Sequence, residues 1–221
     1  MALAAVTEPA FIQRYRAIFE GTSTDASSVD AVRFVALDSE TTGLDPVSDR
    51  IITIGAVAVV NGDIRLGDSF SALLQVTHNT SAVTVHGVTR DQSAGGVEEP
   101  LAVERFLEYL RDGVIVGHHI GHDIAVLDAA CERHWGMRLL NRSLDTMDLT
   151  LHLERDGAFD GHPPVRRYTL DALCEKFGVV PHDRHTAVGD AFITAQVFLR
   201  LVRLASKFNR GTLARICEPF V

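Results

Sequence analysis

The chain has 221 residues, 46% hydrophobic and 23% charged, and this balance is typical of a globular protein with a substantial core. No apolar run is long enough to span a membrane, the N-terminus lacks the basic start of a signal peptide, and three widely spaced cysteines fit a reducing cytoplasm better than a disulfide framework. The formal net charge of −8 argues against a protein that coats nucleic acid, although it permits an enzyme that reaches phosphates through bound metal ions.

The first thirty residues are expected to form an appendage. Apolar residues recur at helical spacing from Pro9 to Glu20, with Thr7 as the cap; such a stripe most often packs against its own domain, although it can also face a partner. A linker from Gly21 to Asp30 follows, rich in small and polar residues. We therefore divide the chain into a helix and linker (1–30), one domain (31–205) and a C-terminal tail (206–221).

Three strands joined by short turns are predicted next. The apolar run Arg33–Leu37 leads into Asp38–Pro46, a pattern typical of a strand that ends in a turn. The run Ile51–Val60 is apolar on both faces and is expected at the centre of a sheet. Asn61-Gly62 is a strong hairpin signal, with Asp63 to Phe70 as the returning strand, so these segments predict an antiparallel meander.

Strands and helices alternate in the second half of the chain. We predict helices over Pro100–Asp112, Ala125–Trp135, Leu170–Phe177 and Gly189–Leu204, and short strands at Val114–Val116 and Leu144–Thr146. Thr89 and Gln92 are a candidate capping pair, and a loop is expected from Arg155 to Arg167. A meander followed by alternating strands and helices predicts one α/β domain with a mixed sheet.

Two carboxylates stand at the end of the first predicted strand. Side chains alternate across a strand, so Asp38 and Glu40 share one face and repel each other unless a cation lies between them. An isolated Asp-x-Glu is more often a solvated strand end, whereas Mg²⁺ and Mn²⁺ favour carboxylate oxygens. The choice therefore depends on whether further carboxylates and a histidine occur later in the chain.

Two later segments supply these groups. Asp123 follows a buried strand at the head of a helix, where its ordinary role is that of a helix cap. His185 precedes the long C-terminal helix, and Asp190 lies in its first turn, where the helix dipole favours a carboxylate. Each residue alone is more often structural, but together His185 and Asp190 place a titratable base within one turn of a carboxylate.

Three motifs in this order resemble those of the DEDDh 3′→5′ exonucleases, which have a ribonuclease H-like fold. The motifs are Asp38-x-Glu40, Gly117-His118-x-x-x-x-Asp123 and His185-x-x-x-x-Asp190, supported by His86–Thr89, Asp145-Thr146 and Tyr168–Asp171. The resemblance covers Ala31 to Leu204, and three ordered motifs are far more specific than any one of them. It implies a mixed five-stranded sheet, an antiparallel meander followed by parallel strands, flanked by helices. The first motif is most similar to the epsilon proofreading subunit of bacterial replicative DNA polymerase and its stand-alone relatives.

The resemblance also implies a two-metal-ion mechanism. Asp38, Glu40, Asp123 and Asp190 would hold two Mg²⁺ or Mn²⁺ ions, and His185 would accept the proton of the attacking water. The product would be a nucleoside 5′-monophosphate from a single-stranded or frayed 3′ end. The terminal nucleotide would lie against Thr41, Thr42, Gly43, Leu44, His119 and His122, although Leu44 could equally be a core residue.

The sequence departs from the family pattern at two of these positions. His119 and His122 stand where Asn and Phe are common, so the lining of the nucleotide pocket is expected to differ. With His118 they form a trio that could bind zinc, but the spacing lacks the Glu of a metalloprotease helix. Arg166, Arg167 and Arg184 are candidates for phosphate contacts, although charged loop residues are usually only solvated.

Three functions stay open at this point. An exonuclease acting on single-stranded or frayed DNA is preferred, and an RNA-trimming enzyme or oligoribonuclease is second, because the contacts to a 2′-hydroxyl that separate the two are not encoded in the motifs. The third is a catalytically silent module that binds nucleic acid or a polymerase, and five intact site residues argue against it. The N-terminal helix and the tail could dock a DNA polymerase or another replication or repair protein.

Overall fold

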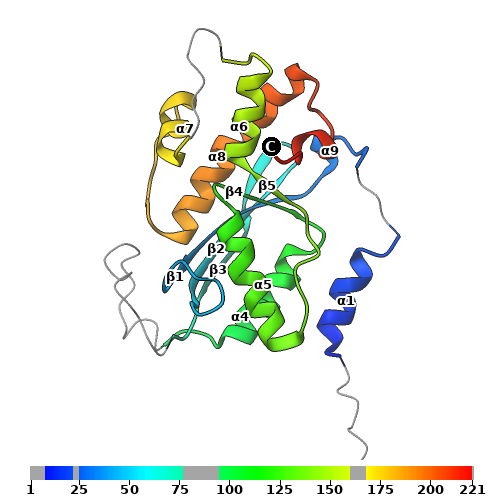
Figure 1. The fold of residues 1–221 in the computed structure, drawn as a ribbon, viewed down its shortest axis with the longest axis vertical. Helices are drawn as coiled ribbons and strands as arrows, with labels where there is room; N and C mark the ends of the chain where they lie inside the picture. Colours follow the sequence, from blue (N-terminus) through cyan, green and yellow to red (C-terminus); the bar gives the residue numbers. More distant parts are fainter. Residues whose placement is uncertain (1–7, 22–24, 77–94, 160–167, 221) are drawn as a thin grey trace, which may run out of the picture.

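A mixed five-stranded sheet forms the centre of the computed structural model, which describes residues 8–21, 25–76, 95–159 and 168–220 (Figure 1). The strands are β1 (Phe34–Thr41), β2 (Ile51–Val60), β3 (Asp63–Leu73), β4 (Val114–Gly117) and β5 (Ser143–Asp145). They lie in the order β3-β2-β1-β4-β5, with β1 antiparallel to β2 and parallel to β4. The predicted fold, a meander followed by parallel strands, is confirmed.

The β2–β3 hairpin follows from the Asn61-Gly62 pair. Both residues have positive φ, 55° and 75°, as a two-residue type I′ turn requires and as Asn and Gly tolerate best. β3 runs to Leu73, beyond the predicted end at Phe70, because β2 offers it backbone partners as far as Thr53.

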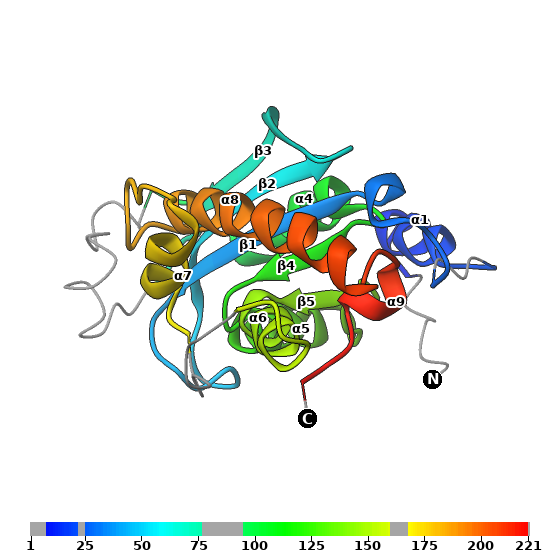
Figure 2. The ribbon, with the colours of Figure 1, turned by 90° about the horizontal axis from the view of Figure 1, so that it is seen from above.

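Helices cover both faces of this sheet (Figures 1 and 2). One face carries α6 (Thr146–Arg155), α7 (Leu170–Phe177) and α8 (Ala187–Ala205), and the other carries α1 (Ala10–Ile18), α4 (Glu99–Leu110) and α5 (Gly121–Trp135). The short helices η1 (Val29–Ala31), η2 (Ser206–Phe208) and α9 (Leu213–Ile216) lie near the ends of the chain. None of the helices in the described part of the chain is long and apolar enough to cross a membrane.

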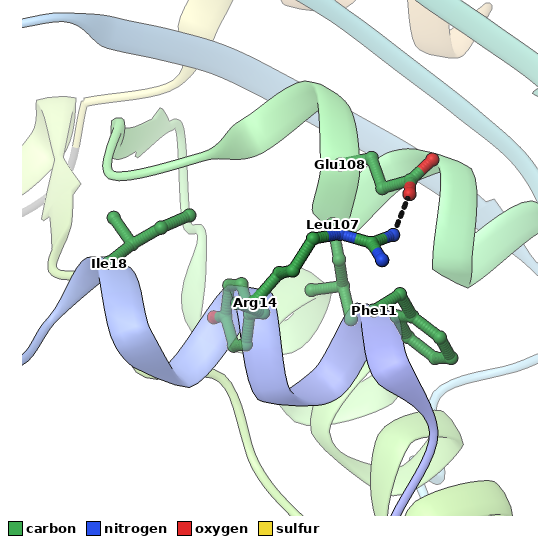
Figure 3. Close-up of a pocket in the computed structure, with 6 residues that line it drawn as sticks. Phe11, Arg14, Ile18, Leu107 and Glu108 are labelled. Carbon is green, nitrogen blue, oxygen red and sulfur yellow. Dashed lines mark hydrogen bonds and ion pairs between the residues drawn. The ribbon is translucent and has the colours of Figure 1, made fainter.

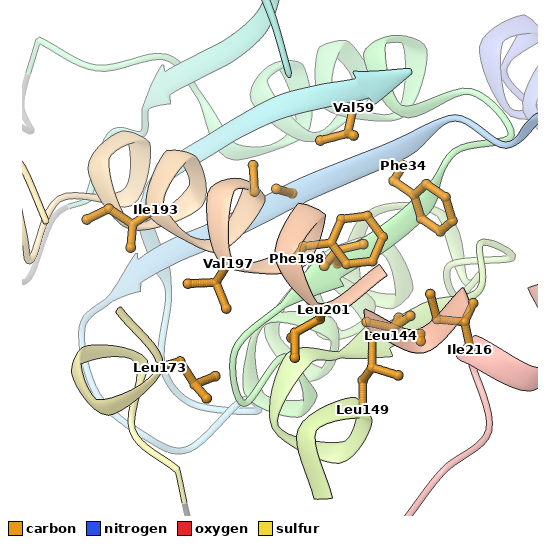
Figure 4. Packing of buried hydrophobic residues seen from close by; sticks show 14 of the residues in the cluster. Phe34, Val59, Leu144, Leu149, Leu173, Ile193, Val197, Phe198, Leu201 and Ile216 are labelled. Carbon is orange, nitrogen blue, oxygen red and sulfur yellow. The ribbon is translucent and has the colours of Figure 1, made fainter. Parts of the chain in front are cut away.

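Strand alternation separates two hydrophobic cores. On β1, Phe34 and Ala36 pack on the α8 side, whereas Val35 and Leu37 pack on the α4 and α5 side. Figure 4 shows the core beneath α8, where the rings of Phe34 and Phe198 lie 4.8 Å apart. The same alternation continues to the end of β1 and places two acidic side chains on the α8 side.

The predicted helices are confirmed with small shifts at their ends, but the sequence analysis missed α6. Its residues include Leu149, Leu151 and Leu153, whose spacing of two residues is that of a strand and not of a helix. The helix forms because Asp145 caps it, accepting a hydrogen bond from the Met147 amide at 2.8 Å. The predicted strand through Thr146 therefore ends one residue earlier, at Asp145.

Several expectations fall outside the described residues. These are the Thr89–Gln92 capping pair, the segment His86–Thr89, the side chains of Arg166 and Arg167, and Thr7. Pro9 occupies the N-cap position of α1, with no side-chain cap hydrogen bond.

Helix α1 packs on its own domain. Tyr15 Oη donates to Asn141 Oδ1 at 2.5 Å and accepts from the Leu140 amide at 2.9 Å, and the Phe11 ring meets the edge of Trp135 at 5.1 Å. Arg14 and Glu108 join α1 to α4 at 2.9 Å beside a groove of about 300 Å³ (Figure 3). These contacts favour the own-domain alternative for the predicted amphipathic helix.

The predicted linker and tail contact each other. Ser28 pairs with Thr212 in an isolated antiparallel bridge, and the Leu213 amide donates to Ser27 O at 3.1 Å. Leu213 and Ile216 are buried in the core beneath α8. The division of the chain at residues 30 and 205 stays a prediction.

Candidate active site

Four carboxylates gather near the end of β1. Asp38 and Glu40 lie on β1, Asp123 lies in the first turn of α5, and Asp190 lies in the first turn of α8. As whole residues, Asp123 and Asp190 are each only 7% exposed. They meet because α5 begins just after β4, the parallel neighbour of β1, and α8 begins against the other side of the sheet.

The approach of α8 depends on Gly55 of β2. Gly55 lies opposite Asp38 in the β1–β2 ladder, and a Cβ there would come within 2.3 Å of the backbone of Ala187 and Val188. Only a residue without a side chain lets the first turn of α8 rest on the strand. The Thr186 side chain caps this turn by accepting from the Gly189 amide at 3.1 Å.

Ser39 fixes Asp123 against β1. Its amide and its hydroxyl donate to Asp123 Oδ1 at 2.8 and 2.6 Å. The N-cap position of α5 belongs to Ile120, which makes no side-chain cap, so the helix-capping alternative for Asp123 is wrong. Asp123 is the third residue of the helix, because the helix begins at Gly121, four residues before the predicted start at Ala125.

Asp190 is held from the segment just before α8. Arg184 Nη1 forms an ion pair with Asp190 Oδ1, and the His185 amide donates to Asp190 Oδ2 at 3.2 Å. Arg184 Nε also donates to Asp171 Oδ1 of α7 at 2.8 Å. His185 itself is exposed and has a φ of 63°. Arg184, a candidate for phosphate contacts, is thus paired with two carboxylates.

Burial raises the pKa of Asp38, Glu40 and Asp123, and repulsion by neighbouring carboxylates adds to the effect at Asp38 and Glu40. Burial, followed by the charges of Asp123, Asp190 and Glu40, raises the pKa of Asp38 to about 9. Burial and the charges of Asp190 and Asp123 raise the pKa of Glu40 to about 7, and burial raises the pKa of Asp123 to about 6. Carboxylates that resist ionisation in this way are stabilised by a nearby cation.

The donor set fits a hard divalent cation because it is made of carboxylate oxygens. Among the described residues, however, no three His, Cys, Asp or Glu side chains converge closely enough to hold one ion. Two of the four carboxylates have partners within the protein: Asp123 accepts from Ser39, and Asp190 pairs with Arg184. The carboxylate oxygens of the site therefore suit a metal ion. The described arrangement of Asp123 and Asp190, however, is the one in which Ser39 and Arg184 hold them.

The turn after β1 carries the predicted nucleotide-binding residues. Thr41 Oγ1 donates to Gly43 O at 2.7 Å and lies 3.3 Å from His122 Nε2, so the first and second motifs meet here. Thr42 is buried and donates to Asp49 Oδ1 at 2.7 Å. Leu44 is 86% exposed, which removes the alternative that it is a core residue.

The predicted histidine trio does not form a zinc site in the described structure. His118 Nδ1 lies 2.9 Å from Thr146 Oγ1, and burial lowers its pKa to about 4, so it is neutral. His119 is exposed, and His122 turns toward Thr41. The rings of His118 and His119 lie 4.6 Å apart, edge to face, whereas His122 lies beside Thr41, so the three side chains do not converge on one point.

The sequence analysis missed the partners that hold the site. Asp145 accepts from the amides of His119 and Ile120, both at 3.1 Å, and so ties the end of β5 to the start of α5. Ser39 and the Arg184–Asp171 pair were likewise given no such role. Asp145 and Asp171 both lie in supporting motifs, which was the available signal for their importance.

The geometry agrees with the comparison to known families. The family model described as "Exonuclease" matches residues 35–198. The chain therefore belongs to the exonuclease family, as the ordered motifs predicted, and its relatives include a DNA polymerase III subunit epsilon-like protein.

Two relatives are named as DNA polymerase III proteins. The chain is 34% identical over 196 residues to a DNA polymerase III PolC-type protein of Thermotoga petrophila, covering 86% of this chain and 13% of the relative. It is 35% identical over 179 residues to a DNA polymerase III subunit epsilon-like protein of Rhodobacter capsulatus, covering 79% of this chain and 24% of the relative. The chain thus spans less than a quarter of the length of either relative.

Two solved nucleases share the fold. Escherichia coli Exonuclease I in complex with a dT13 oligonucleotide matches with a TM-score of 0.68 at 16% identity, over 80% of this chain and 42% of that one. Exonuclease X in complex with 5′ overhanging duplex DNA matches with a TM-score of 0.59 at 21% identity, over 85% of this chain and 99% of that one.

Proposed function

We propose that this chain is a metal-dependent exonuclease that removes nucleoside 5′-monophosphates from the 3′ ends of single-stranded or frayed DNA. The observation that carries the proposal is the cluster of Asp38, Glu40, Asp123 and Asp190, whose repulsion is costly unless the cluster serves a cation. A silent binding module would have no use for such a cluster. DNA is preferred over RNA because the two relatives are named as DNA polymerase III proteins and both solved neighbours hold DNA.

The four carboxylates would hold two divalent ions, Mg²⁺ or Mn²⁺, which prefer oxygen ligands. Such ions, when bound, make water more acidic and stabilise the charge on a leaving oxygen. The raised pKa of Asp38 and of Glu40 supports this assignment, because a cation would return both groups to their ionised form.

Side chains around the cluster would accept the proton and bind the nucleotide. His185 is exposed beside Asp190 and would take the proton of the attacking water on its ring nitrogen. The turn from Thr41 to Leu44 would receive the terminal nucleotide, with the exposed Leu44 side chain against the base. His119 and His122 would line the other side of that nucleotide, since His122 already lies beside Thr41.

Association with a polymerase is a further part of the proposal. It is supported by the relatives, in which the matched region is a small part of a longer protein named as a polymerase III. The location in the cytoplasm stays a prediction from the cysteine content.

A degradation assay tests the proposed activity. 5′-Labelled single-stranded DNA and RNA of one sequence would be incubated with Mg²⁺, Mn²⁺ or EDTA and with the wild type, Asp38→Ala, His185→Ala or Asp63→Ala. We expect a metal-dependent ladder that shortens from the 3′ end and is lost in the first two variants. Asp63→Ala, an exposed carboxylate at the β2–β3 turn, should retain full activity. Faster loss of RNA would transfer the proposal to an RNA-trimming enzyme, and binding without shortening would favour the silent module.

A further inference from the structure

Two successive ion pairs connect the candidate metal site to Asp171, a residue outside it. Asp171, in the first turn of α7, binds Arg184, and Arg184 in turn binds Asp190. Asp171 is 63% exposed, whereas the side chains of Arg184 and Asp190 are 22% and 11% exposed. The guanidinium therefore spans from the surface into the carboxylate cluster.

Both oxygens of Asp190 already have donors. Arg184 occupies Oδ1, and the amide of the next residue, His185, occupies Oδ2 at 3.2 Å. A metal ion that used Asp190 as a ligand would have to share or displace a donor from this short segment. The positive charge of Arg184 is the donor that a metal ion would repel.

Arg184 also acts on the rest of the cluster. Against the upward effect of burial, its charge lowers the pKa of Asp38 and of Glu40. The Arg184 guanidinium thus supplies part of the positive charge that four close carboxylates require. In the metal-free protein this lessens their repulsion.

We propose that Arg184 is an internal counter-cation for Asp190 that a divalent ion displaces, and that Asp171 retains the released guanidinium. This inference rests on the proposed metal site and adds a positioning residue that sets its affinity. The Arg fork permits the exchange because Nε holds Asp171 while Nη1 holds Asp190. Loss of one contact leaves the other in place.

The exchange would also move the proposed base. Asp183 and His185, which flank Arg184, both have positive φ, 52° and 63°, a left-handed conformation that favours glycine. The hydrogen bonds to Asp190 and Asp171 help to keep this turn in place. Release of Arg184 from Asp190 would therefore couple metal binding to the position of His185.

Calorimetric titration of Mn²⁺ into the full chain tests the proposal without any substrate. Arg184→Gln removes the competing charge, and we expect Mn²⁺ to bind about tenfold more tightly, the equivalent of one charge-assisted hydrogen bond. Arg184→Lys keeps the charge but loses the fork, so its Mn²⁺ affinity should lie closer to that of the wild type than to that of Arg184→Gln. Asp171→Asn removes the alternative partner of Arg184 and should weaken Mn²⁺ binding.

The control is Arg138→Gln, which removes the same charge from an exposed pair with Glu132 at the far end of α5. It should leave Mn²⁺ affinity unchanged, and circular dichroism would verify that every variant is folded. Equal or weaker binding by folded Arg184→Gln, with the wild type still binding Mn²⁺, overturns the role of Arg184 alone. Absence of binding by both folded proteins overturns the proposed metal site together with it.

Discussion

The raised pKa of Asp38 makes the stability of the folded protein depend on pH. Its pKa lies at about 9 in the folded protein, against an ordinary value of 3.8, mainly because it is buried and then because of Asp123, Asp190 and Glu40. Between these two values the folded protein holds a proton that the unfolded chain has released. The free energy of unfolding must therefore fall as the pH rises through this range, in the absence of metal.

Asp38→Asn is expected to remove part of this pH dependence. At pH 8 without metal, the variant should gain about 1–2 kcal/mol, or about 2–8 °C in Tm for a protein of this size, because the amide is neutral and folding no longer requires this buried side chain to take up a proton. Thermal unfolding in EDTA from pH 5 to pH 9 measures the effect. The exposed Asp63→Asn serves as the control, and a wild-type slope retained in Asp38→Asn would contradict the assignment of the raised pKa.

His185→Ala separates chemistry from metal binding. The side chain is exposed and only its amide contacts Asp190, so the variant should fold and bind Mn²⁺ as the wild type does. Loss of a general base should lower kcat by about 10²–10⁴. Single-turnover kinetics on labelled DNA, together with a Mn²⁺ titration, would measure both quantities, and an unchanged kcat would assign the proton transfer to another group.

The four acidic residues could be predicted from the sequence because strand alternation and the order of the motifs were enough to identify them. The alternation put Asp38 and Glu40 on one face, and the structure places Asp123 and Asp190 beside them. The roles of Ser39 and Arg184 as hydrogen-bond and ion-pair partners could not be predicted from the sequence. Their roles depend on side-chain directions that arise only when β1, α5 and α8 are assembled.

At the scale of elements, the site depends on how closely α8 approaches the sheet. Gly55→Ala would place a methyl group 2.3 Å from the backbone at the start of α8. Because backbone must move to relieve this contact, we expect a loss of about 1–3 kcal/mol in the free energy of unfolding. Activity should fall further than stability, since Asp190 lies in the displaced turn.

Urea unfolding and the degradation assay would test this pair of effects. Gly67→Ala in β3 is the matched control, because a Cβ there meets nothing within 4 Å. Wild-type activity in Gly55→Ala would show that the position of α8 tolerates the shift.

The helix α6 shows where the reading of elements from sequence failed. Its leucines alternate with polar residues, so local periodicity favoured a strand, while the cap at Asp145 and burial beneath α8 favour a helix. The hairpin at Asn61-Gly62 was predictable because its signal is local. Tertiary packing favours the helical conformation of α6, and a short stretch of sequence does not reveal that packing.

On the scale of the whole molecule, the two ends of the chain stabilise each other. The Ala214 amide of the tail donates to Asp25 O at 3.2 Å, and the Asp25 carboxylate also pairs with Arg142, just before β5. Arg210, only 6% exposed, joins the tail to Asp156 after α6 and to Glu218. Composition suggested a linker and a tail, but contacts between segments more than 180 residues apart leave no local pattern, as Ser28 and Thr212 illustrate.

Leu213→Ala tests whether the tail is part of the folding unit. Leu213 is 1% exposed and packs in the core beneath α8, so its truncation should cost about 2–5 kcal/mol, with the larger values expected if the cavity cannot collapse. Leu66→Ala, on a leucine that is 68% exposed in β3, should change the free energy of unfolding by less than about 0.5 kcal/mol. Urea unfolding monitored by circular dichroism would compare them. A cost for Leu213→Ala as small as that for Leu66→Ala would favour the tail as an appendage, whereas one cooperative transition with a large loss would extend the folding unit beyond residue 205.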